Sequence, residues 1–168
     1  MKSHEKEQLL TTIIQIDSNK IFKCKNINGL ILYSLKKNLE EKCIKNGFVL
    51  PNTISIVERS YGKMINIDKV SKIQYSLTYK VKTLLPKKDD EYECIIDSIT
   101  KMGIISYFST NKEEDIKNSP LLIIIPREYI EEDRLNSMTK GQKIRVKVLD
   151  SRIKYRAEQI QVVATSIF

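Results

Sequence analysis

The stretch GQKIRVKVLDSRIKYRAEQIQVV, residues 141–163, decides how the second half of the chain folds. Basic and apolar residues alternate from position 143 to 148, the pattern of a strand that is buried on one face and wet on the other. The basic alternation resumes after a short break, with a tyrosine among its members: Lys143, Arg145, Lys147, Arg152, Lys154, Tyr155 and Arg156. Such a stretch fits a surface for single-stranded nucleic acid, and it also fits a merely solvated strand face.

The segments around this stretch also predict short strands. Residues 92–100 and 103–109 flank the tight connection KMG, and residues 121–126 form an apolar run that ends at a proline. Residues 127–130 fit one helical turn, and residues 111–119 a polar loop. Five strands with one helical turn between the third and the fourth predict a small all-β OB barrel.

The first half of the chain has a different pattern. Residues 26–47 predict a helix with a four-residue apolar stripe, Asn26 as its cap and Asn46–Gly47 as its stop. Residues 11–16 predict a short strand, and residues 72–84 predict the clearest strand in the chain, with strict alternation. The expected fold class is therefore α+β, with a helix on a small antiparallel sheet followed by the barrel.

Charge and composition divide the chain near Leu85. A proline and five consecutive charged residues follow this position, which predicts domains at 1–84 and 85–168. The first half carries 15 Lys or Arg against 7 Asp or Glu, and the second carries 14 of each. In the second half the acids cluster before residue 134, whereas residues 140–156 hold seven bases and one acid. We interpret this sorting of charge as a sign of nucleic-acid contact.

The sequence offers little for catalysis. It contains one histidine, His4, and three cysteines without metal-ligand spacing, so we expect no enzyme activity, no cofactor and no metal. The loop RSYGKM has one glycine, too few for a phosphate-binding loop. No apolar run approaches the roughly 20 residues of a membrane span. We expect an intracellular, reducing location and no membrane partner.

The order of these parts resembles a known family. The segments YKVKTLLPKKDDEYECIIDSITKMGIISYF and GQKIRVKVLDSRIKYRAEQIQVVATSI, behind a helix that ends in Asn46–Gly47 and a glycine tip at Gly62, are similar to the larger stalk subunit of multisubunit DNA-dependent RNA polymerases. This family comprises RNA polymerase II subunit 7, its archaeal counterpart and short relatives in large DNA viruses. The compact length favours a viral relative.

The resemblance implies a non-catalytic subunit. Its N-terminal domain would dock on polymerase core subunits near the clamp through a tip made of Ser60, Tyr61, Gly62 and Lys63. Its barrel would contact nascent RNA through a surface drawn from Lys101, Tyr107, Arg145, Lys147, Arg152 and Lys154. Tyr107 is the favoured stacking residue of the barrel, although Ile104 and Ile105 stand where the family commonly has an aromatic.

The family also implies a location, in the nucleus for a cellular polymerase or in a cytoplasmic viral factory and virion for a viral one. A smaller stalk subunit is a partner on which the sequence is silent. Two other functions remain open. One is a free-standing OB-fold protein that binds single-stranded RNA, and the other is a purely structural interaction subunit.

Overall fold

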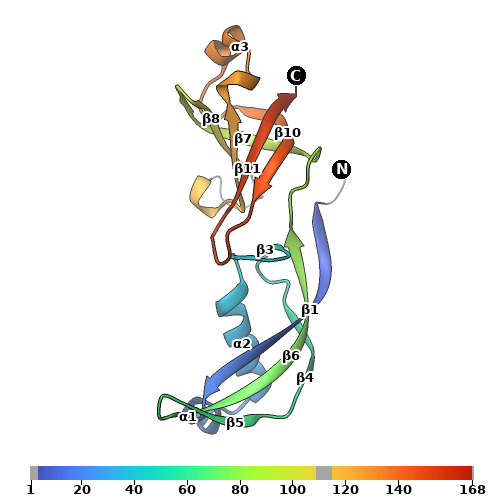
Figure 1. Cartoon of the computed structure of the whole chain (residues 1–168), viewed down its shortest axis with the longest axis vertical. Coiled ribbons are helices and arrows are strands. Elements are labelled where there is room, and N and C mark those ends of the chain that lie inside the picture. The colour runs from blue at the N-terminus through green and yellow to red at the C-terminus, as the bar shows by residue number, and fades with distance from the viewer. Residues whose placement is uncertain (1–3, 109–114, 168) are drawn as a thin grey trace. The chain divides into compact units, whose positions relative to one another are not determined.

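The computed structural model describes residues 4–108 and 115–167, shown in Figure 1. The chain is α+β and mostly β, and its contacts divide it into two compact units. The first unit holds the described residues up to Glu41 together with Val49–Thr83. The second holds Lys42–Phe48 together with the residues from Leu84 onward. The expected division lay between residues 84 and 85. The observed division differs mainly because Lys42–Phe48 belongs to the second unit.

The first unit contains two helices and a sheet whose longest strand is β6. The elements of this unit are β1 (Glu5–Asp17), α1 (Ser18–Lys23), α2 (Ile27–Leu39), β4 (Ser55–Arg59), β5 (Lys63–Ile67) and β6 (Val70–Leu84). The last residue of β6, Leu84, is assigned to the second unit. β6 pairs with β1, β4 and β5. Its predicted alternation is confirmed, because Tyr75, Leu77 and Tyr79 are buried while the residues between them are not. Both helices contact β1.

The helix α2 starts as predicted and ends earlier. The Asn26 side chain accepts a hydrogen bond from the Gly29 N–H, at 3.0 Å, and caps the first turn. The helix was expected to continue to Asn46–Gly47, and this is wrong, because it ends at Leu39. Glu41 then takes a φ of 57° and donates its N–H to the Val49 carbonyl, so pairing in the sheet replaces the last helical turns.

The segment that the helix was expected to fill forms a short hairpin of β2 (Cys43–Ile44) and β3 (Gly47–Val49). Asn46–Gly47 lies at its turn, where Gly47 has a φ of 131°. A Cβ at Gly47 would approach the Leu84 carbonyl oxygen to 2.6 Å, so only glycine fits this close backbone contact.

The second unit contains a closed barrel of five strands, as predicted. The strands are β7 (Glu91–Thr100), β8 (Gly103–Phe108), β9 (Leu121–Pro126), β10 (Lys143–Arg152) and β11 (Ile160–Ile167). Their order around the barrel is β10-β11-β9-β8-β7, and β10 pairs with β7 to close it. Every pairing is antiparallel except β9 with β11. This topology is consistent with an OB-like fold.

The barrel core is built from β-branched and other aliphatic side chains on the inner faces of the strands. The fully buried members include Ile104, Leu121, Ile123, Ile125, Val146, Val148, Ile160 and Val162. Each such burial stabilises the fold by about 1.5–3 kcal/mol. At the β7–β8 turn, Gly103 has a φ of 141°, and a Cβ there would meet the Ile125 carbonyl oxygen at 2.1 Å. This glycine is therefore required for β8 to pack against β9.

Short helices connect the barrel strands. The helical turn expected at residues 127–130 is present as η2 (Arg127–Tyr129), and a second helix, α3 (Glu132–Ser137), follows it. Before β9 lies η1 (Ile116–Asn118). Residues 109–114, which include the last residue of the strand predicted at 103–109 and the first part of the polar loop predicted at 111–119, fall outside the described residues. None of the helices in the described parts of the chain has the length and apolar character needed to cross a membrane.

Candidate functional site

The outer face of β10 carries the predicted alternation of basic residues, which we call the β10 wall: Lys143, Arg145 and Lys147. Ile144, Val146 and Val148 point into the core between them, as predicted. The wall is not a free positive surface, because each of its bases pairs with an acid at the start of β7 or just before it. The Nζ–O or Nη–O distances are 3.9 Å for Lys143–Glu93, 3.1 Å for Arg145–Glu91 and 3.5 Å for Lys147–Asp89.

This pairing corrects the interpretation of charge sorting. The acids of residues 89–93 are distant from residues 143–147 in the sequence, but the β7–β10 pairing places them side by side. The sequence contained the signal, since Asp89, Glu91 and Glu93 alternate with the same two-residue period as the bases. Comparing the charge patterns of these two strands, which are neighbours in an OB barrel, would have revealed the ion pairs.

The second set of bases lies at the connection between β10 and β11, which we call the basic connection (residues 152–156). Arg152, Lys154 and Arg156 are all exposed, and no carboxylate among the described residues lies within ion-pair distance of them. Tyr155 is 68% exposed, and the Arg156 guanidinium lies 5.6 Å from the centre of its ring. The connection therefore combines free cations with an accessible aromatic face.

The β2–β3 hairpin holds the basic connection in place. The Cys43 N–H donates to the Ala157 carbonyl at 2.8 Å, and the Arg156 N–H donates to the Cys43 carbonyl at 2.8 Å. Arg156 takes a φ of 63° at this point, so its backbone is fixed in an uncommon conformation. The exposed turn residue Lys45 lies two positions from Cys43 and adds a cation that sequence analysis did not select.

Two residues predicted for the RNA-facing surface lie elsewhere. Tyr107 is only 6% exposed, so its ring is part of the barrel core, and its selection as an outward stacking residue is wrong. Alternation placed Tyr107 and Phe108 on opposite faces without showing which face is the inner one. Lys101 is exposed in the β7–β8 turn. The strand register places that turn at the opposite end of the barrel from the basic connection.

The predicted docking tip lies in the connection between β4 and β5, where Ser60, Tyr61, Gly62 and Lys63 are all exposed. Tyr61 is 96% exposed, and two apolar neighbours, Val57 and Met64, are 54% and 63% exposed. A Cβ at Gly62 would approach the Ile73 Cγ2 atom to 2.7 Å, so glycine allows the loop to pack on β6. The tip is a compact loop that presents apolar side chains to solvent.

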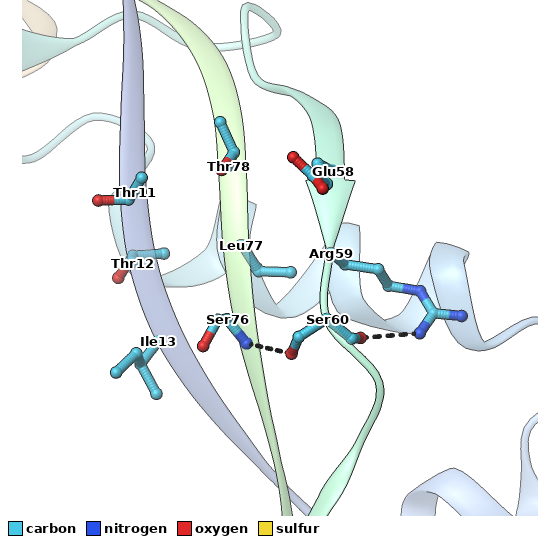
Figure 2. A pocket seen from close by; sticks show the side chains of 9 residues that line it. All are labelled: Thr11, Thr12, Ile13, Glu58, Arg59, Ser60, Ser76, Leu77 and Thr78. Carbon is cyan, nitrogen blue, oxygen red and sulfur yellow. Dashed lines mark hydrogen bonds between the residues drawn. The ribbon is translucent and has the colours of Figure 1, made fainter.

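A shallow hollow lies on the sheet beside this tip, and Figure 2 shows β6 between β1 and β4 at this point. Its lining residues are Thr11, Thr12, Ile13, Glu58, Arg59, Ser60, Ser76, Leu77 and Thr78. The Ser76 N–H donates to the Ser60 hydroxyl at 2.9 Å, and Arg59 donates to the Ser60 carbonyl at 3.3 Å. Arg59 also donates to the Asn28 side chain at 2.7 Å. These contacts hold β4 in place against β6 and α2.

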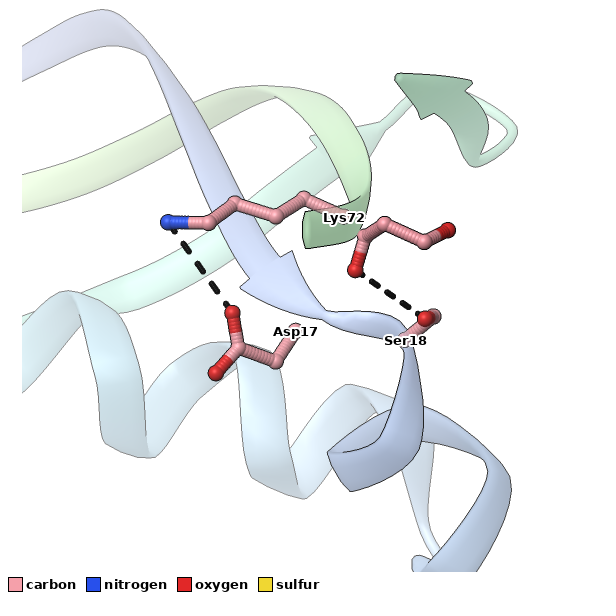
Figure 3. A network of polar contacts seen from close by, with 4 residues as sticks. Asp17, Ser18 and Lys72 are labelled. Atoms are coloured by element: carbon pink, nitrogen blue, oxygen red, sulfur yellow. Dashed lines mark hydrogen bonds and ion pairs between the residues drawn. The ribbon is translucent and has the colours of Figure 1, made fainter. Parts of the chain in front are cut away.

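Polar contacts also fix the end of β1 against the start of β6, as Figure 3 shows. The Ser18 hydroxyl donates to the Ser71 carbonyl at 3.0 Å, and the Lys72 ammonium lies 3.9 Å from an Asp17 carboxylate oxygen. Ser18 is buried, so its hydroxyl needs this acceptor. The contacts stabilise the part of the sheet from which the β5–β6 hairpin projects.

The buried thiols lack the character of nucleophiles. Burial raises the pKa of Cys43 and of Cys94 to about 11, so both thiols stay protonated near neutral pH. Burial, reinforced by the nearby Asp90 charge, also raises the pKa of Tyr92. Among the residues that the structure describes, no three His, Cys, Asp or Glu side chains gather closely enough to hold a metal ion.

Comparisons with known proteins add little to this geometry. No protein-family model matches the chain, and no curated protein matches it. Among solved structures, an uncharacterized protein from Methanocaldococcus jannaschii is similar, with 15% identity and a TM-score of 0.38. The match covers 50% of this chain and 96% of that chain. A likeness of this extent leaves the function to be argued from the chain's own residues.

Proposed function

We propose that the chain is a non-catalytic stalk subunit of a multisubunit DNA-dependent RNA polymerase. In this proposal the first unit is a helix-on-sheet tip domain that docks on core subunits near the clamp. The barrel is an OB fold that contacts nascent RNA during transcription. The proposal extends to an intracellular site of transcription, in the nucleus or in a viral factory.

The observation that carries the proposal is the presence of two different exposed surfaces on two different units. The β4–β5 tip offers Tyr61, which is 96% exposed, and the adjoining Met64 of β5 is 63% exposed; exposed aromatic and methionine side chains are typical of protein interfaces. The basic connection offers free cations beside Tyr155, which is the combination that single-stranded nucleic acid requires. A subunit that joins a protein complex to an emerging transcript needs both surfaces.

The RNA contact is assigned mainly to the basic connection and to a lesser extent to the β10 wall. Each phosphate neutralised by a free base releases counterions, which makes the salt dependence of binding steeper by about 0.7 per contact for a single strand. The bases of the wall already have carboxylate partners, and a phosphate would have to displace them. We therefore expect modest RNA affinity for the isolated chain.

Affinity purification of the tagged chain from its native source, with mass spectrometry of the proteins recovered, tests the docking proposal. We expect the large polymerase subunits to be recovered, and recovery of none would contradict the proposal. The variant Tyr61→Ala should reduce that recovery severalfold, because an exposed interface tyrosine is a common hot spot. Tyr33→Ala is the matched control, since Tyr33 lies on α2 with 63% exposure and outside the tip.

A free-standing single-strand binder is the second candidate, and the basic connection favours it as well. It predicts tight binding by the chain alone, whereas the stalk subunit predicts weak binding alone and a stable complex with polymerase. A purely structural subunit predicts no effect of substitutions in residues 152–156. The same purification and an RNA titration of the pure chain separate the three functions.

A further inference from the structure

The strands β7 and β10 share a row of three ion pairs on their outer face, which we call the acid ladder: Asp89–Lys147, Glu91–Arg145 and Glu93–Lys143. The six side chains are 43–66% exposed, so the row is open to solvent and to large ligands. Within the strands every second residue contributes, which places Glu91, Glu93 and the three bases on one face, and Asp89 in the turn before β7 reaches the same row through its ion pair with Lys147. The ladder has three charges of each sign and a net charge of zero.

The pairing is diagonal, so each glutamate affects two bases. Glu93 lies opposite Arg145 in the register and forms its ion pair with Lys143. Glu91 lies opposite Lys147 and forms its ion pair with Arg145, with a charge-assisted hydrogen bond of 3.1 Å. Removing one glutamate therefore changes the potential at two cations, since direct and diagonal neighbours in a sheet are both within reach.

We propose that the acid ladder is a built-in competitor that keeps single-stranded RNA off the β10 wall and confines it to the basic connection. This inference rests on the RNA contact that forms part of the proposed function. A phosphate that approached the wall would meet a carboxylate at every base. It would gain little from the release of the cations condensed on the RNA, because each carboxylate that it displaced would attract a cation in turn. The acids thus determine where on the barrel the RNA lies.

The basic connection supplies the internal contrast. Arg152, Lys154 and Arg156 continue the alternation of the wall on the same polypeptide, and among the described residues none of them lies within ion-pair distance of an acid. Along this stretch of chain, the bases without an ion-pair partner therefore begin beyond the last ion pair of the ladder. Specificity of this kind, in which unfavourable contacts exclude a ligand from a wrong position, is common in macromolecular recognition.

The test is a titration of the full chain with a fluorescently labelled oligouridylate of about 12 nucleotides, within the site sizes of OB folds. The acid-ladder variant carries Asp89→Asn, Glu91→Gln and Glu93→Gln. We expect its salt slope to steepen by up to about 2 and its affinity at about 0.1 M salt to rise by about 10-fold to 100-fold, because three bases become available to phosphates.

A matched control separates the release of the β10 wall bases from their carboxylates from the effect of a more positive net charge. The variant Glu131→Gln, Glu132→Gln and Asp133→Asn makes the same change in net charge around α3, and it also releases Arg134 and Arg127 from their ion pairs. We expect its RNA affinity to change less than about threefold, because those residues lie outside both basic surfaces. An equal gain in the two variants would overturn the proposal.

A second combination tests the bases themselves. Adding Lys143→Gln, Arg145→Gln and Lys147→Gln to the acid-ladder variant should abolish its gain in affinity and salt slope. If the gain persisted, the acids would act through the general field and the proposal would be wrong. If the acid-ladder variant did not unfold cooperatively, Glu91→Gln alone should give a slope change of about 0.7. If RNA affinity and salt slope changed in neither variant, the ladder proposal would be wrong. The proposed polymerase complex would still be tested separately, by affinity purification.

Discussion

The β10 wall and the basic connection are two basic regions on one continuous stretch of chain, and they differ in their neighbours. The wall bases lie 3.1–3.9 Å from acids of the paired segment, whereas the connection extends beyond the last of those acids. The connection also carries an exposed tyrosine, which the wall lacks. The comparison teaches that a basic pattern along one strand becomes a binding surface only where the adjacent strand leaves it uncompensated.

The largest expected effect comes from neutralising the basic connection. The variant Arg152→Gln, Lys154→Gln and Arg156→Gln should weaken binding of oligouridylate by about 100-fold at about 0.1 M salt, with a salt slope shallower by about 2. Titrations at several salt concentrations measure both quantities. Neutralising Lys143, Arg145 and Lys147 instead should weaken binding by less than about threefold. If the wall variant lost more affinity than the connection variant, the comparison between the two regions would be reversed.

The next largest effect concerns local opening of the structure beneath the basic connection and beneath the β10 wall. Cys43 lies beneath the basic connection, held by two backbone hydrogen bonds, and Cys94 lies beneath the wall between β8 and β10. Both thiols are fully buried, and burial raises both pKa values to about 11, so labelling by a thiol reagent near pH 8 requires local opening. In a Cys24→Ala background we expect Cys43 to react about tenfold faster or more, because the hairpin opens without the barrel. Equal rates would show that the two regions open together.

A smaller effect is expected for the aromatic side chain of the connection. Tyr155→Ala should weaken oligouridylate binding by about fivefold, the lower end of the roughly 1–3 kcal/mol that one stacked base contributes. The salt slope should stay the same, because no charge is removed. Tyr129→Ala, at a 48% exposed position in η2, is the control. A changed slope with unchanged affinity would indicate that Tyr155 positions Arg156 and does not stack on a base.

The smallest effect is expected for a single base of the wall. Arg145→Gln removes the shortest ion pair of the ladder, and exposed pairs of this kind contribute about 0.2–1 kcal/mol to stability. We expect a change of this size in the free energy of unfolding from urea titration, and an RNA affinity within about twofold of the wild type. A large loss of RNA affinity from this one substitution would place the phosphate path on the wall.

Much of the barrel could be predicted from the sequence because its strands are short and apolar on at least one face. Ile144, Val146 and Val148 identify the inner face of β10 by period alone, whereas the continuous apolar run at residues 121–126 predicts a buried strand without identifying its inner face. The first unit was less predictable. The four-residue spacing of Leu39 and Cys43 continued the helical pattern, but sheet pairing of the next segment ended the helix at Leu39. Local periodicity could not reveal that competition.

The candidate site was predicted in part. Arg152, Lys154, Tyr155 and Arg156 are exposed as expected. The exposed Lys45 could not be selected, because the β2–β3 hairpin meets this connection only through tertiary hydrogen bonds at Cys43. Tyr107 was misplaced because a period of two gives two faces without naming the inner one. The acid partners of the wall were visible in the sequence as a matching period of opposite charge.

The closing pairs of the barrel have a consequence for synthesis on the ribosome. Because β11 pairs with both β9 and β10, the barrel cannot close until β11 has left the ribosome. Until then, the earlier strands of the barrel keep unpaired edges. The β2–β3 hairpin is synthesised early but completes its contacts late, because Cys43 forms hydrogen bonds with residues 156 and 157. Such late, distant pairing slows folding, and the nascent chain needs shielding from premature strand exchange during translation.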